Sequence, residues 1–498
     1  MDSFEEEMKK LDDLSEEKEA VIEEMGELDK KKKDKNTIYT SFLETRDFIY
    51  EQVINAEECG GAESKTDQNM TSFIKYNKKD DTWERVNSFK YRGMTYNPIM
   101  DEVFTKGGVC LSTDVEEYKN TKEILEQIKN YLNERIQLPT KPINYEKFLP
   151  HLILFYWVYE KFPFIPYVHF VGGTSTGKTT AMEVFGDLCY KAVDSTSSLT
   201  IASMFRIATQ WKGTMLIDEF NSSGEEAKDL VTFLKAGVSN RLLYRVEGEK
   251  KKELKAYIIK SPKVFTSEQP ISDAGLQSRT VVIKMERNTR KLPLFFLKKD
   301  FDEITHIRNK LLLWRLRNFN KIDLEAIRYG FPELQGFDRR VQQIITPVYY
   351  FSDEETKGDI LEFARDQENE TFRSRRESLD GVIFSYLAET WESGEEAQVK
   401  VICTKFNVEQ SSRGYKGEYS ERKISNIIRK ILGFNTEVRG HEKLAWVVRN
   451  IDMEINKRSY YGFPPVANSG LIMPLLPTLP TQDNPQDIIK EAQQIFNA

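Results

Sequence analysis

The sequence predicts an α/β protein in which helices flank a parallel β-sheet. Three observations carry this prediction. Short apolar runs of strand length recur between residues 167 and 285, and each of them ends in small or polar residues. Segments with helical periodicity separate these runs, which is the alternation that a parallel sheet requires. The first run leads directly into a glycine-rich loop and then into an apolar helical stretch.

The composition is that of a water-soluble globular chain. Its 498 residues are 39% hydrophobic and 30% charged, which excludes a collagen-like, mucin-like or wholly disordered protein. No apolar stretch is long enough for a transmembrane helix, and the first residues lack the apolar core of a secretory signal. The cysteines and histidines lie far apart, so we expect a cytoplasmic protein without a disulfide framework or a zinc site. The net charge of −7 leaves room only for local basic patches.

Periodicity and charge divide the chain into six segments. We predict a charged helix or coiled coil (1–35), a small N-terminal α/β domain (36–114), an α/β core with leading helices (115–300), a helical lid (301–376), a winged-helix domain (377–450), and a proline-rich tail with a short terminal helix (451–498). For residues 1–35 a solvated single helix or a frayed tail is an equal alternative, because the heptads are too few to decide. Residues 40–57 are expected to be helical and residues 71–110 to form β-hairpins.

The glycine-rich loop between a strand and a helix is the main chemical signal. The apolar run YVHFV (167–171) precedes the loop, and the stretch TAMEVFGDLCY follows it. Small residues let the backbone wrap around phosphates, while the helix N-terminus adds partial positive charge. Lys178 is predicted to reach the β- and γ-phosphates of a nucleotide, and the Thr179 hydroxyl to ligate Mg²⁺. The predicted nucleotide-binding residues are Gly172, Gly173, Thr174, Ser175, Thr176, Gly177, Lys178, Thr179 and Thr180.

Two later strands supply polar groups for catalysis. The run TMLI (214–217) ends in Asp218 and Glu219. We expect Asp218 to hold Mg²⁺ through water and Glu219 to polarise the attacking water as general base. A third run, KVFT (263–266), ends in Ser267, the favoured residue for positioning that water, with the register defined only to within one residue. Two adjacent acids favour hydrolysis of the nucleotide over transfer of its phosphoryl group.

The segments GGTSTGKT, TMLIDEF, PKVFTSEQP and LQSRTVVIKM together resemble the AAA+ ATPases. Within them, the resemblance is to the helicase branch of the minichromosome-maintenance proteins and related replication ATPases of viruses and plasmids. It covers residues 150–350. By this resemblance, Arg279 in the turn LQSR is an arginine finger that reaches the ATP of a neighbouring subunit. The resemblance therefore implies a ring, expected to be a hexamer, that binds ATP and Mg²⁺.

The same resemblance assigns a DNA-gripping role to an inserted hairpin. Two strand-like runs lie within residues 241–260, and their tip is expected to carry Lys250, Lys251 and Lys252. In the helicase branch such a hairpin projects into a central channel and holds the backbone of single-stranded DNA. A solvated basic turn is the alternative. The family also places an arginine of the lid at the γ-phosphate. Arg340 is the first candidate and Arg339 the second, with a surface salt bridge as the alternative for either.

Residues 377–450 are predicted to form a winged helix, with three helices followed by two strands around Gly440. The third helix opens at Ser420 and displays basic residues that we expect to contact DNA. These residues are Arg422, Lys423, Arg429 and Lys430. Winged helices also dock proteins, so a partner protein is the alternative. From residue 451 the prolines predict an extended linker, followed by a short amphipathic helix, DIIKEAQQIFNA (487–498).

These features lead to one main hypothesis and two alternatives. The main hypothesis is a ring-forming AAA+ ATPase that uses Mg²⁺-ATP to translocate along DNA and unwind it, in the replication of a virus, plasmid or other mobile element. Its partners would be further copies of itself, single-stranded DNA in the channel and replication proteins, with no membrane involved. The first alternative is an AAA+ remodeller or loader that acts on protein partners. The second is an ATP-gated initiator that binds DNA without unwinding it.

Overall fold

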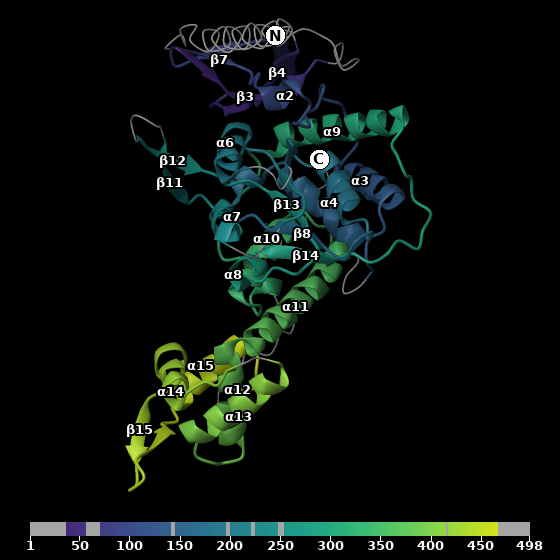
Figure 1. The fold of residues 1–498 in the computed structure, drawn as a ribbon. Coiled ribbons are helices and arrows are strands. Elements are labelled where there is room, and N and C mark those ends of the chain that lie inside the picture. Colours follow the sequence, from purple (N-terminus) through teal and green to yellow (C-terminus); the bar gives the residue numbers. More distant parts are fainter. Residues whose placement is uncertain are drawn as a thin grey trace, which may run out of the picture. The chain divides into compact units, whose positions relative to one another are not determined.

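The computed structural model describes residues 36–55, 70–140, 145–195, 200–220, 225–247, 253–414 and 417–466 (Figure 1). The chain forms two compact units, one ending at Val115 and the other beginning at Glu116. The sequence predicts this boundary at 114 and further boundaries at 300, 376 and 450. The predicted coiled coil at 1–35 and the predicted helix after Gln486 lie outside the described residues. No described helix combines the length and the apolarity needed to cross a lipid bilayer.

The described residues of the N-terminal unit form two small sheets and one short helix. Its elements are β1 (Thr37–Tyr39), β2 (Phe42–Glu44), β3 (Phe48–Ile54), β4 (Thr71–Asn77), β5 (Thr82–Val86), β6 (Phe89–Tyr91), β7 (Met94–Asn97) and α2 (Glu102–Thr105). Strands β2-β3-β4-β5 form an antiparallel sheet, and β1-β7-β6 form a three-stranded sheet. The hairpins expected within residues 71–110 are present as β4–β5 and β6–β7. Tyr50, Phe73 and Phe89 pack together as the core.

The helix predicted for residues 40–57 is wrong, because this segment carries β2 and β3. Strand β3 pairs with β4 from Phe48↔Asn77 to Ile54↔Thr71. Its aromatic and β-branched residues suit a pleated surface better than a helix. Its five central residues are all buried, so the polar–apolar alternation of a half-exposed strand is missing from the sequence.

The second unit is built on a five-stranded parallel sheet. Its strands are β8 (Tyr167–Val171), β9 (Val193–Ser195), β10 (Met215–Ile217), β13 (Lys263–Ser267) and β14 (Thr280–Lys284). They lie in the order β14-β8-β13-β10-β9, and every neighbouring pair is parallel. The three central strands are buried on both faces, which explains their continuous apolar sequences. The predicted parallel sheet flanked by helices is therefore confirmed.

Helices and one inserted hairpin surround this sheet. The helices are α3 (Thr121–Arg135), α4 (Tyr145–Tyr156), α5 (Lys178–Asp187), α6 (Ile201–Trp211), α7 (Glu225–Gly237) and the short α8 (Ala274–Gln277). A 3₁₀ turn, η2 (Tyr159–Lys161), follows α4. The hairpin consists of β11 (Leu242–Glu247) and β12 (Glu253–Ile258), which pair antiparallel. The lysines predicted for its tip lie outside the described residues.

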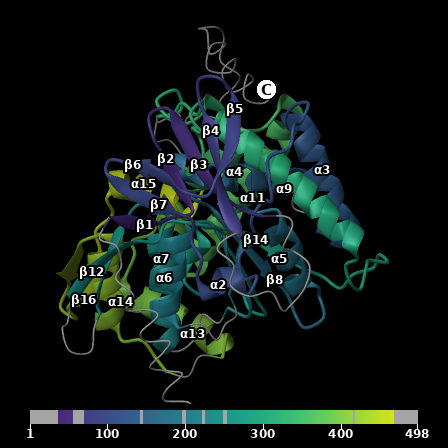
Figure 2. The ribbon, with the colours of Figure 1, turned by 90° about the horizontal axis from the view of Figure 1, so that it is seen from above.

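Helix α9 (Lys298–Asn318), which the sequence assigns to a separate lid, packs along α3 (Figure 2). The Trp314 indole N–H donates to the Thr121 hydroxyl at 3.1 Å. Arg135, at the end of α3, forms an ion pair of 2.6 Å with Asp300 in the first turn of α9. The boundary predicted at 300 therefore does not coincide with a change in packing.

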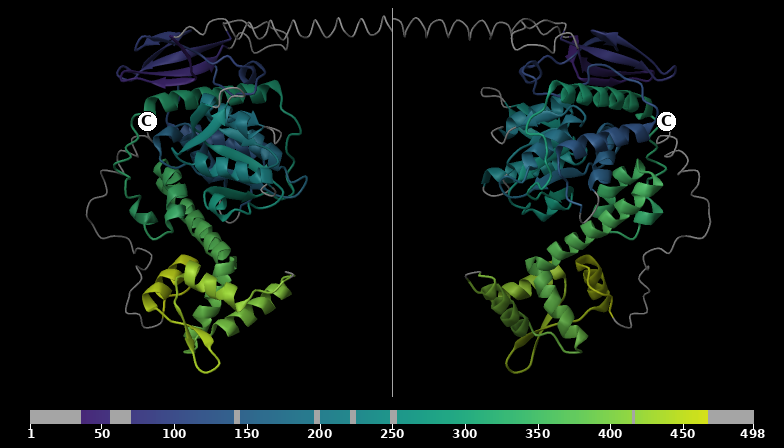
Figure 3. Two further views of the ribbon diagram at one scale, coloured as in Figure 1. Left: turned by 60° about the vertical axis from the view of Figure 1, so that its left-hand side comes forward. Right: turned by 90° about the vertical axis from the view of Figure 1, so that its right-hand side faces the viewer.

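The chain continues into a C-terminal module (Figure 3). The 3₁₀ turn η3 (Pro332–Leu334), α10 (Arg339–Tyr350) and the long α11 (Glu354–Glu377) lead into it. The module consists of α12 (Leu379–Glu392), α13 (Val399–Ser412), α14 (Glu421–Ile427), the π-helical turn η4 (Ile428–Leu432), β15 (Thr436–Arg439), β16 (Leu444–Val447) and α15 (Ile451–Tyr461). Gln398, just before α13, forms an isolated bridge with Trp446 in β16. This bridge ties the helices to the β15–β16 hairpin.

The extended linker predicted from residue 451 is wrong for its first eleven residues, which form α15. The Asn450 side chain caps this helix by accepting the N–H of Met453, and Gly462 ends it with a φ of 67°. Tyr461 is buried in the core of the C-terminal module. The prolines that predict an extended chain begin only at 464, after the helix has ended.

Candidate functional site

The glycine-rich loop joins the buried strand β8 to helix α5. A Cβ atom at Gly172 would lie 2.6 Å from the Met285 carbonyl oxygen, so this position has no room for a side chain. Gly177 has a φ of 79°, in the left-handed region that favours glycine. The Thr176 hydroxyl donates to the Gly173 carbonyl oxygen at 2.9 Å. These contacts hold the loop in one tight conformation at the carboxyl end of β8.

The loop presents hydrogen-bond donors and a positive charge to an anion. Helix α5 begins after Gly177 without a side-chain cap, so its first N–H groups are available to phosphate oxygens. Lys178 Nζ lies 3.2 Å from the Gly173 carbonyl oxygen, and this lysine forms no ion pair with any described residue. The predicted binding residues Thr174, Ser175 and Thr180 are exposed. The loop therefore has the donors and the charge that a polyphosphate needs.

Strand β10 brings Asp218 to the start of α5. The Thr179 hydroxyl donates to the Asp218 carboxylate, at 3.2 Å to Oδ1 and 3.4 Å to Oδ2. The structure thus brings together the two residues in which the sequence predicts Mg²⁺ ligands. A hydroxyl and a carboxylate are the hard oxygen donors that Mg²⁺ prefers, so these residues fit the ion.

Glu219 follows Asp218 in a strained turn. Its φ of 53° lies in a region that a non-glycine residue occupies only when its surroundings hold it there. The Glu219 N–H donates to Asp218 Oδ1 and to the Thr266 hydroxyl, both at 3.0 Å. The side chain is exposed at the carboxyl end of the sheet, next to Asp218.

Thr266, and not the predicted Ser267, contacts the two acids. The Thr266 hydroxyl donates to the Asp218 carboxylate and accepts the Glu219 N–H. Ser267 is buried, and its hydroxyl lies 2.6 Å from His169 Nε2 on the neighbouring β8. Burial lowers the pKa of His169 to about 3, so this imidazole is neutral. Successive side chains of a strand point to opposite faces, so an error of one residue in register exchanges the two roles.

A further acid near this site was not predicted from the sequence. Glu183 lies on α5 one turn after Thr179, on the same face of the helix. Its pKa is raised by burial and by repulsion from Asp194, Asp187 and Asp218. The accumulated negative charge is what a divalent cation would neutralise. The four-residue spacing from Thr179 is the sequence signal that identifies this acid.

Arg279 lies at the opposite end of the sheet from the glycine-rich loop. It directly precedes β14, and its carbonyl oxygen accepts the N–H of Tyr167, the first residue of β8, at 3.1 Å. Gly172 follows the last residue of β8, so about 16 Å of extended strand separates it from this end. The Arg279 guanidinium therefore cannot reach the loop of its own chain.

Two further arginines lie near Arg279. Burial lowers the pKa of the Arg279 guanidinium, and repulsion from Arg340 and Arg241 lowers it further. Arg340 lies in the first turn of α10 and donates to the Gln343 side chain at 2.9 Å. Within the described part of the chain, none of the three arginines forms an ion pair. We call Arg241, Arg279 and Arg340 the arginine cluster.

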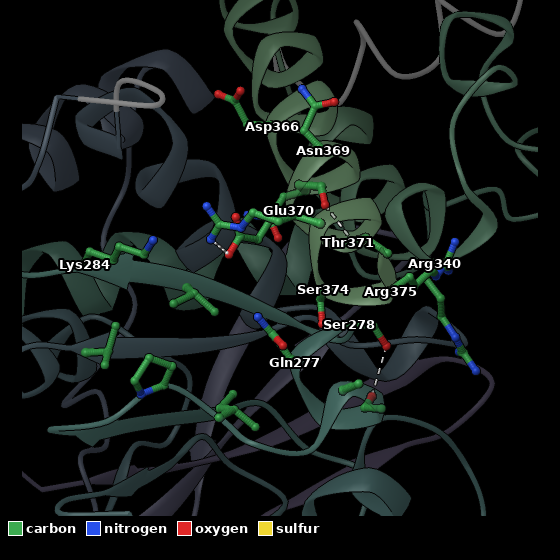
Figure 4. Close-up of a pocket in the computed structure, with 18 of the residues that line it drawn as sticks. Gln277, Ser278, Lys284, Arg340, Asp366, Asn369, Glu370, Thr371, Ser374 and Arg375 are labelled. Atoms are coloured by element: carbon green, nitrogen blue, oxygen red, sulfur yellow. Dashed lines mark hydrogen bonds and ion pairs between the residues drawn. The ribbon is translucent and has the colours of Figure 1, made fainter. Parts of the chain in front are cut away.

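A cavity of about 720 Å³ lies between α11 and the β14 edge of the sheet (Figure 4). In Figure 4, Ser278 and Arg340 lie at one end of the cavity and Lys284 lies at the other. Lys284 pairs with Val171, the residue before the glycine-rich loop. Arg340 is thus on the Arg279 side and not on the loop side. No residue of the loop from Gly172 onwards lines the cavity, so the cavity is distinct from the glycine-rich loop.

The basic residues predicted to contact DNA lie exposed on the third helix of the C-terminal module and on the turn η4 that continues it. They are Arg422, Lys423, Arg429 and Lys430. The two pairs are seven positions apart, which is close to two helical turns, so they lie on one face. Lys423 Nζ lies 3.9 Å from the centre of the Tyr419 ring. None of the four forms an ion pair with a described residue, which leaves this face basic.

Comparison with known proteins shows distant likeness of structure. No protein-family model matches the chain, and no curated protein matches it. The SCCmec type IV Cch active helicase matches at 13% sequence identity over 86% of this chain and 81% of its own, with a TM-score of 0.40. An apo structure of the NrS-1 C-terminal region matches at 13% identity over 80% of this chain and 96% of its own, with a TM-score of 0.37. At such low similarity, only the site geometry bears on function.

Proposed function

We propose that this protein is a ring-forming, ATP-dependent DNA helicase or translocase that serves the replication of a virus, plasmid or other mobile element. The observation that carries the proposal is the division of the site between the two ends of one sheet. Phosphate donors and oxygen ligands lie at the carboxyl end, while the arginine cluster lies at the amino end. A nucleotide bound at the loop of one chain would meet the arginines of the next chain in a head-to-tail ring.

The residues at the loop and at the ends of the neighbouring strands have different roles in ATP hydrolysis. Lys178 and the uncapped N-terminus of α5 bind the phosphates of ATP. Thr179 and Asp218 would hold Mg²⁺, which neutralises charge on the phosphate oxygens. Glu219 accepts a proton from the attacking water. Thr266 orients both acids through its contacts with the Asp218 carboxylate and the Glu219 N–H.

The neighbouring chain completes this site. Arg279 acts as the arginine finger, and Arg340 adds a second positive charge from the same end of the sheet. An arginine finger stabilises negative charge that develops on the transferred phosphoryl group and is worth roughly 10³–10⁵-fold in rate. Because Arg279 cannot reach its own loop, this contribution depends on assembly.

DNA contact is proposed at the basic face of α14 and η4. Exposed guanidinium and ammonium groups without acidic partners bind phosphates by releasing counterions, whatever the DNA sequence. The order of three helices and a hairpin, tied by the Gln398–Trp446 bridge, supports the prediction of a winged helix. Lys250, Lys251 and Lys252 stay a prediction for the channel contact, since they lie outside the described residues.

The test is ATP hydrolysis by the full chain with and without single-stranded DNA. We expect single-stranded DNA to stimulate hydrolysis. Lys178→Ala should abolish hydrolysis, whereas Lys90→Ala, which removes an exposed lysine of the N-terminal unit, should leave it unchanged. A double variant, Arg422→Ala with Arg429→Ala, should weaken DNA binding and reduce its dependence on salt.

Two outcomes would favour the alternatives. Hydrolysis that responds to no DNA, single-stranded or duplex, would indicate a remodeller or loader of proteins. Tight binding of duplex DNA that is unchanged by Glu219→Gln, without unwinding of a forked substrate, would indicate an ATP-gated initiator. Either result contradicts the helicase proposal.

A further inference from the structure

One face of the β11–β12 hairpin is apolar and exposed. Cross-strand pairing places Leu242 opposite Ile258 and Tyr244 opposite Ala256, and Leu254 lies two residues before Ala256 on the same face. The exposed fractions of Tyr244 and Leu254 are 61% and 67%. We call Leu242, Tyr244, Leu254, Ala256 and Ile258 the hairpin patch.

The opposite face of the hairpin anchors it to the rest of the unit. Leu243 and Tyr257 are directly paired, and both pack into the core cluster beside the sheet. The Tyr257 ring packs edge-on against Phe205 of α6 at 5.4 Å between centroids. A two-stranded hairpin held on one face presents its other face in a defined orientation. Because that exposed face is apolar, it indicates a surface that a partner covers.

A second exposed apolar surface lies where the chain enters α9. It consists of Leu294, Phe295, Leu297 and Phe301, and we call it the loop patch. Leu294 is 95% exposed and Phe295 is 72% exposed. Isolated exposed apolar residues are common on proteins, but four large ones within eight positions are not.

The two patches belong to opposite ends of the parallel sheet. The hairpin patch begins directly after Arg241, a member of the arginine cluster, and β12 leads into Lys263 at the amino end of β13. The loop patch follows the carboxyl end of β14, where Met285 donates its N–H to the Val171 carbonyl oxygen at 2.7 Å, beside the glycine-rich loop. Figure 1 shows the hairpin on the left of the second unit and the segment between β14 and α9 on the right.

We infer that the hairpin patch of one chain docks on the loop patch of the next copy of this chain. The inference rests on the proposed function, and it names the contact that brings Arg279 to the neighbouring glycine-rich loop. The occupant is a second copy because the hairpin patch is continuous with the arginine cluster, whose positive charge has no ion-pair partner among the described residues. The same contact that buries the hairpin would bring that charge to a bound triphosphate.

The geometry of the two patches agrees with a ring. Different surfaces of identical chains form a head-to-tail contact, and such contacts repeat into a ring when the rotation between neighbours closes and into an open filament when it does not. A two-fold dimer would instead require one patch to cover itself. Burial of several large apolar side chains on each partner supplies the non-directional attraction, while the arginine–phosphate contact supplies the register.

The experiment is crosslinking between two single-cysteine chains, Leu254→Cys and Phe295→Cys, in a background without the native cysteines. We expect a short bifunctional maleimide to join the two different chains in the presence of Mg²⁺ and a non-hydrolysable ATP analogue. Each variant alone should give no dimer band. Val438→Cys, in the β15–β16 hairpin and 65% exposed, is the matched partner that should not crosslink with Phe295→Cys.

A charged substitution in the hairpin patch provides a second test of the docking contact. Leu254→Glu should weaken assembly by about tenfold or more, measured as the midpoint of oligomer formation by mass photometry, while Val438→Glu should leave it unchanged. Circular dichroism and thermal unfolding check that the variants are folded. Because both substituted positions are exposed, loss of assembly with an unchanged unfolding curve supports docking at the patch.

Failure of the inference and failure of the proposed function look different. If the wild-type chain assembles and is stimulated by DNA, but Leu254→Glu assembles normally and the cysteines do not crosslink, the docking inference is overturned and the function stands. A crosslink from Leu254→Cys to its own N-terminal unit would also overturn it. If the wild-type chain never assembles under any nucleotide condition, both proposals fall.

Discussion

Sharing of the active site can be tested by mixing two inactive variants. Lys178→Ala removes the ammonium that binds phosphate, and Arg279→Ala removes the proposed finger from the other end of the sheet. The two residues lie at opposite ends of the five-residue strand β8, about 16 Å apart along the strand, so one nucleotide cannot contact both in the same chain. Each variant by itself should therefore form rings in which every site is incomplete.

The expected recovery of the hydrolysis rate follows from counting the complete sites in a mixed ring. Loss of the finger alone should lower the rate by roughly 10³-fold or more. In rings assembled from equal amounts of the two variants, a site works when its loop comes from an Arg279→Ala chain and its finger from a Lys178→Ala chain. Random assembly makes about a quarter of the sites complete, since each condition is met with a probability of about one half. Recovery should thus approach about a quarter of the wild-type rate, which far exceeds either parent.

The assay is steady-state ATP hydrolysis on rings whose composition is verified by native mass spectrometry. Mixing before and after assembly provides the control, because preassembled rings that exchange slowly should show no recovery. Mixed rings of confirmed composition that recover less than a few per cent of wild-type activity would refute a shared site. The roles of Arg279 and the assembly argument would then both be withdrawn.

Three further predictions concern single residues. Glu219→Gln should leave nucleotide binding intact and lower hydrolysis about 10²-fold or more, because no general base remains; measured binding and rates that fall together would contradict this role. Thr266→Val should lower the hydrolysis rate about tenfold or more, since it removes one of the donors that orient the Asp218 carboxylate and the acceptor of the Glu219 N–H, whereas Ser267→Ala should change the rate little; the reverse order would restore the sequence-based prediction. Burial lowers the pKa of Lys263 to about 7. Between about pH 7 and 10 the unfolded chain therefore keeps a proton on Lys263 that the folded chain loses. The free energy of unfolding of the wild type relative to Lys263→Met, measured by urea unfolding, should rise by up to ~1.4 kcal/mol per pH unit in this range. A free-energy difference that does not depend on pH would exclude the lowered pKa of Lys263.

Much of the geometry of the candidate site was predictable because its signals are local. The glycine-rich loop, its flanking strand and the helix that follows occupy one continuous stretch of sequence. Asp218 and Glu219 are recognisable because they end a buried apolar strand. In a parallel sheet the carboxyl ends of strands meet at one edge, so the contact between Thr179 and Asp218 follows from topology.

The sequence-based predictions that fail concern residues whose structure depends on tertiary contacts. The choice between Thr266 and Ser267 depends on which face of β13 is directed at the acids, and an apolar run buried on both faces gives no alternation from which to read it. The sequence predicts a helix in place of strand β3 for the same reason. The position of Arg340 depends on the packing of α10, which no local motif specifies.

The proposed function requires that one chain alone cannot hydrolyse ATP efficiently. The direct measurement is the hydrolysis rate per chain over a dilution series from micromolar to nanomolar protein, with the oligomeric state determined by mass photometry in the same samples. We expect the rate per chain to fall in parallel with the fraction of assembled chains. A rate per chain that stays at its full value in samples that contain only monomers would contradict it.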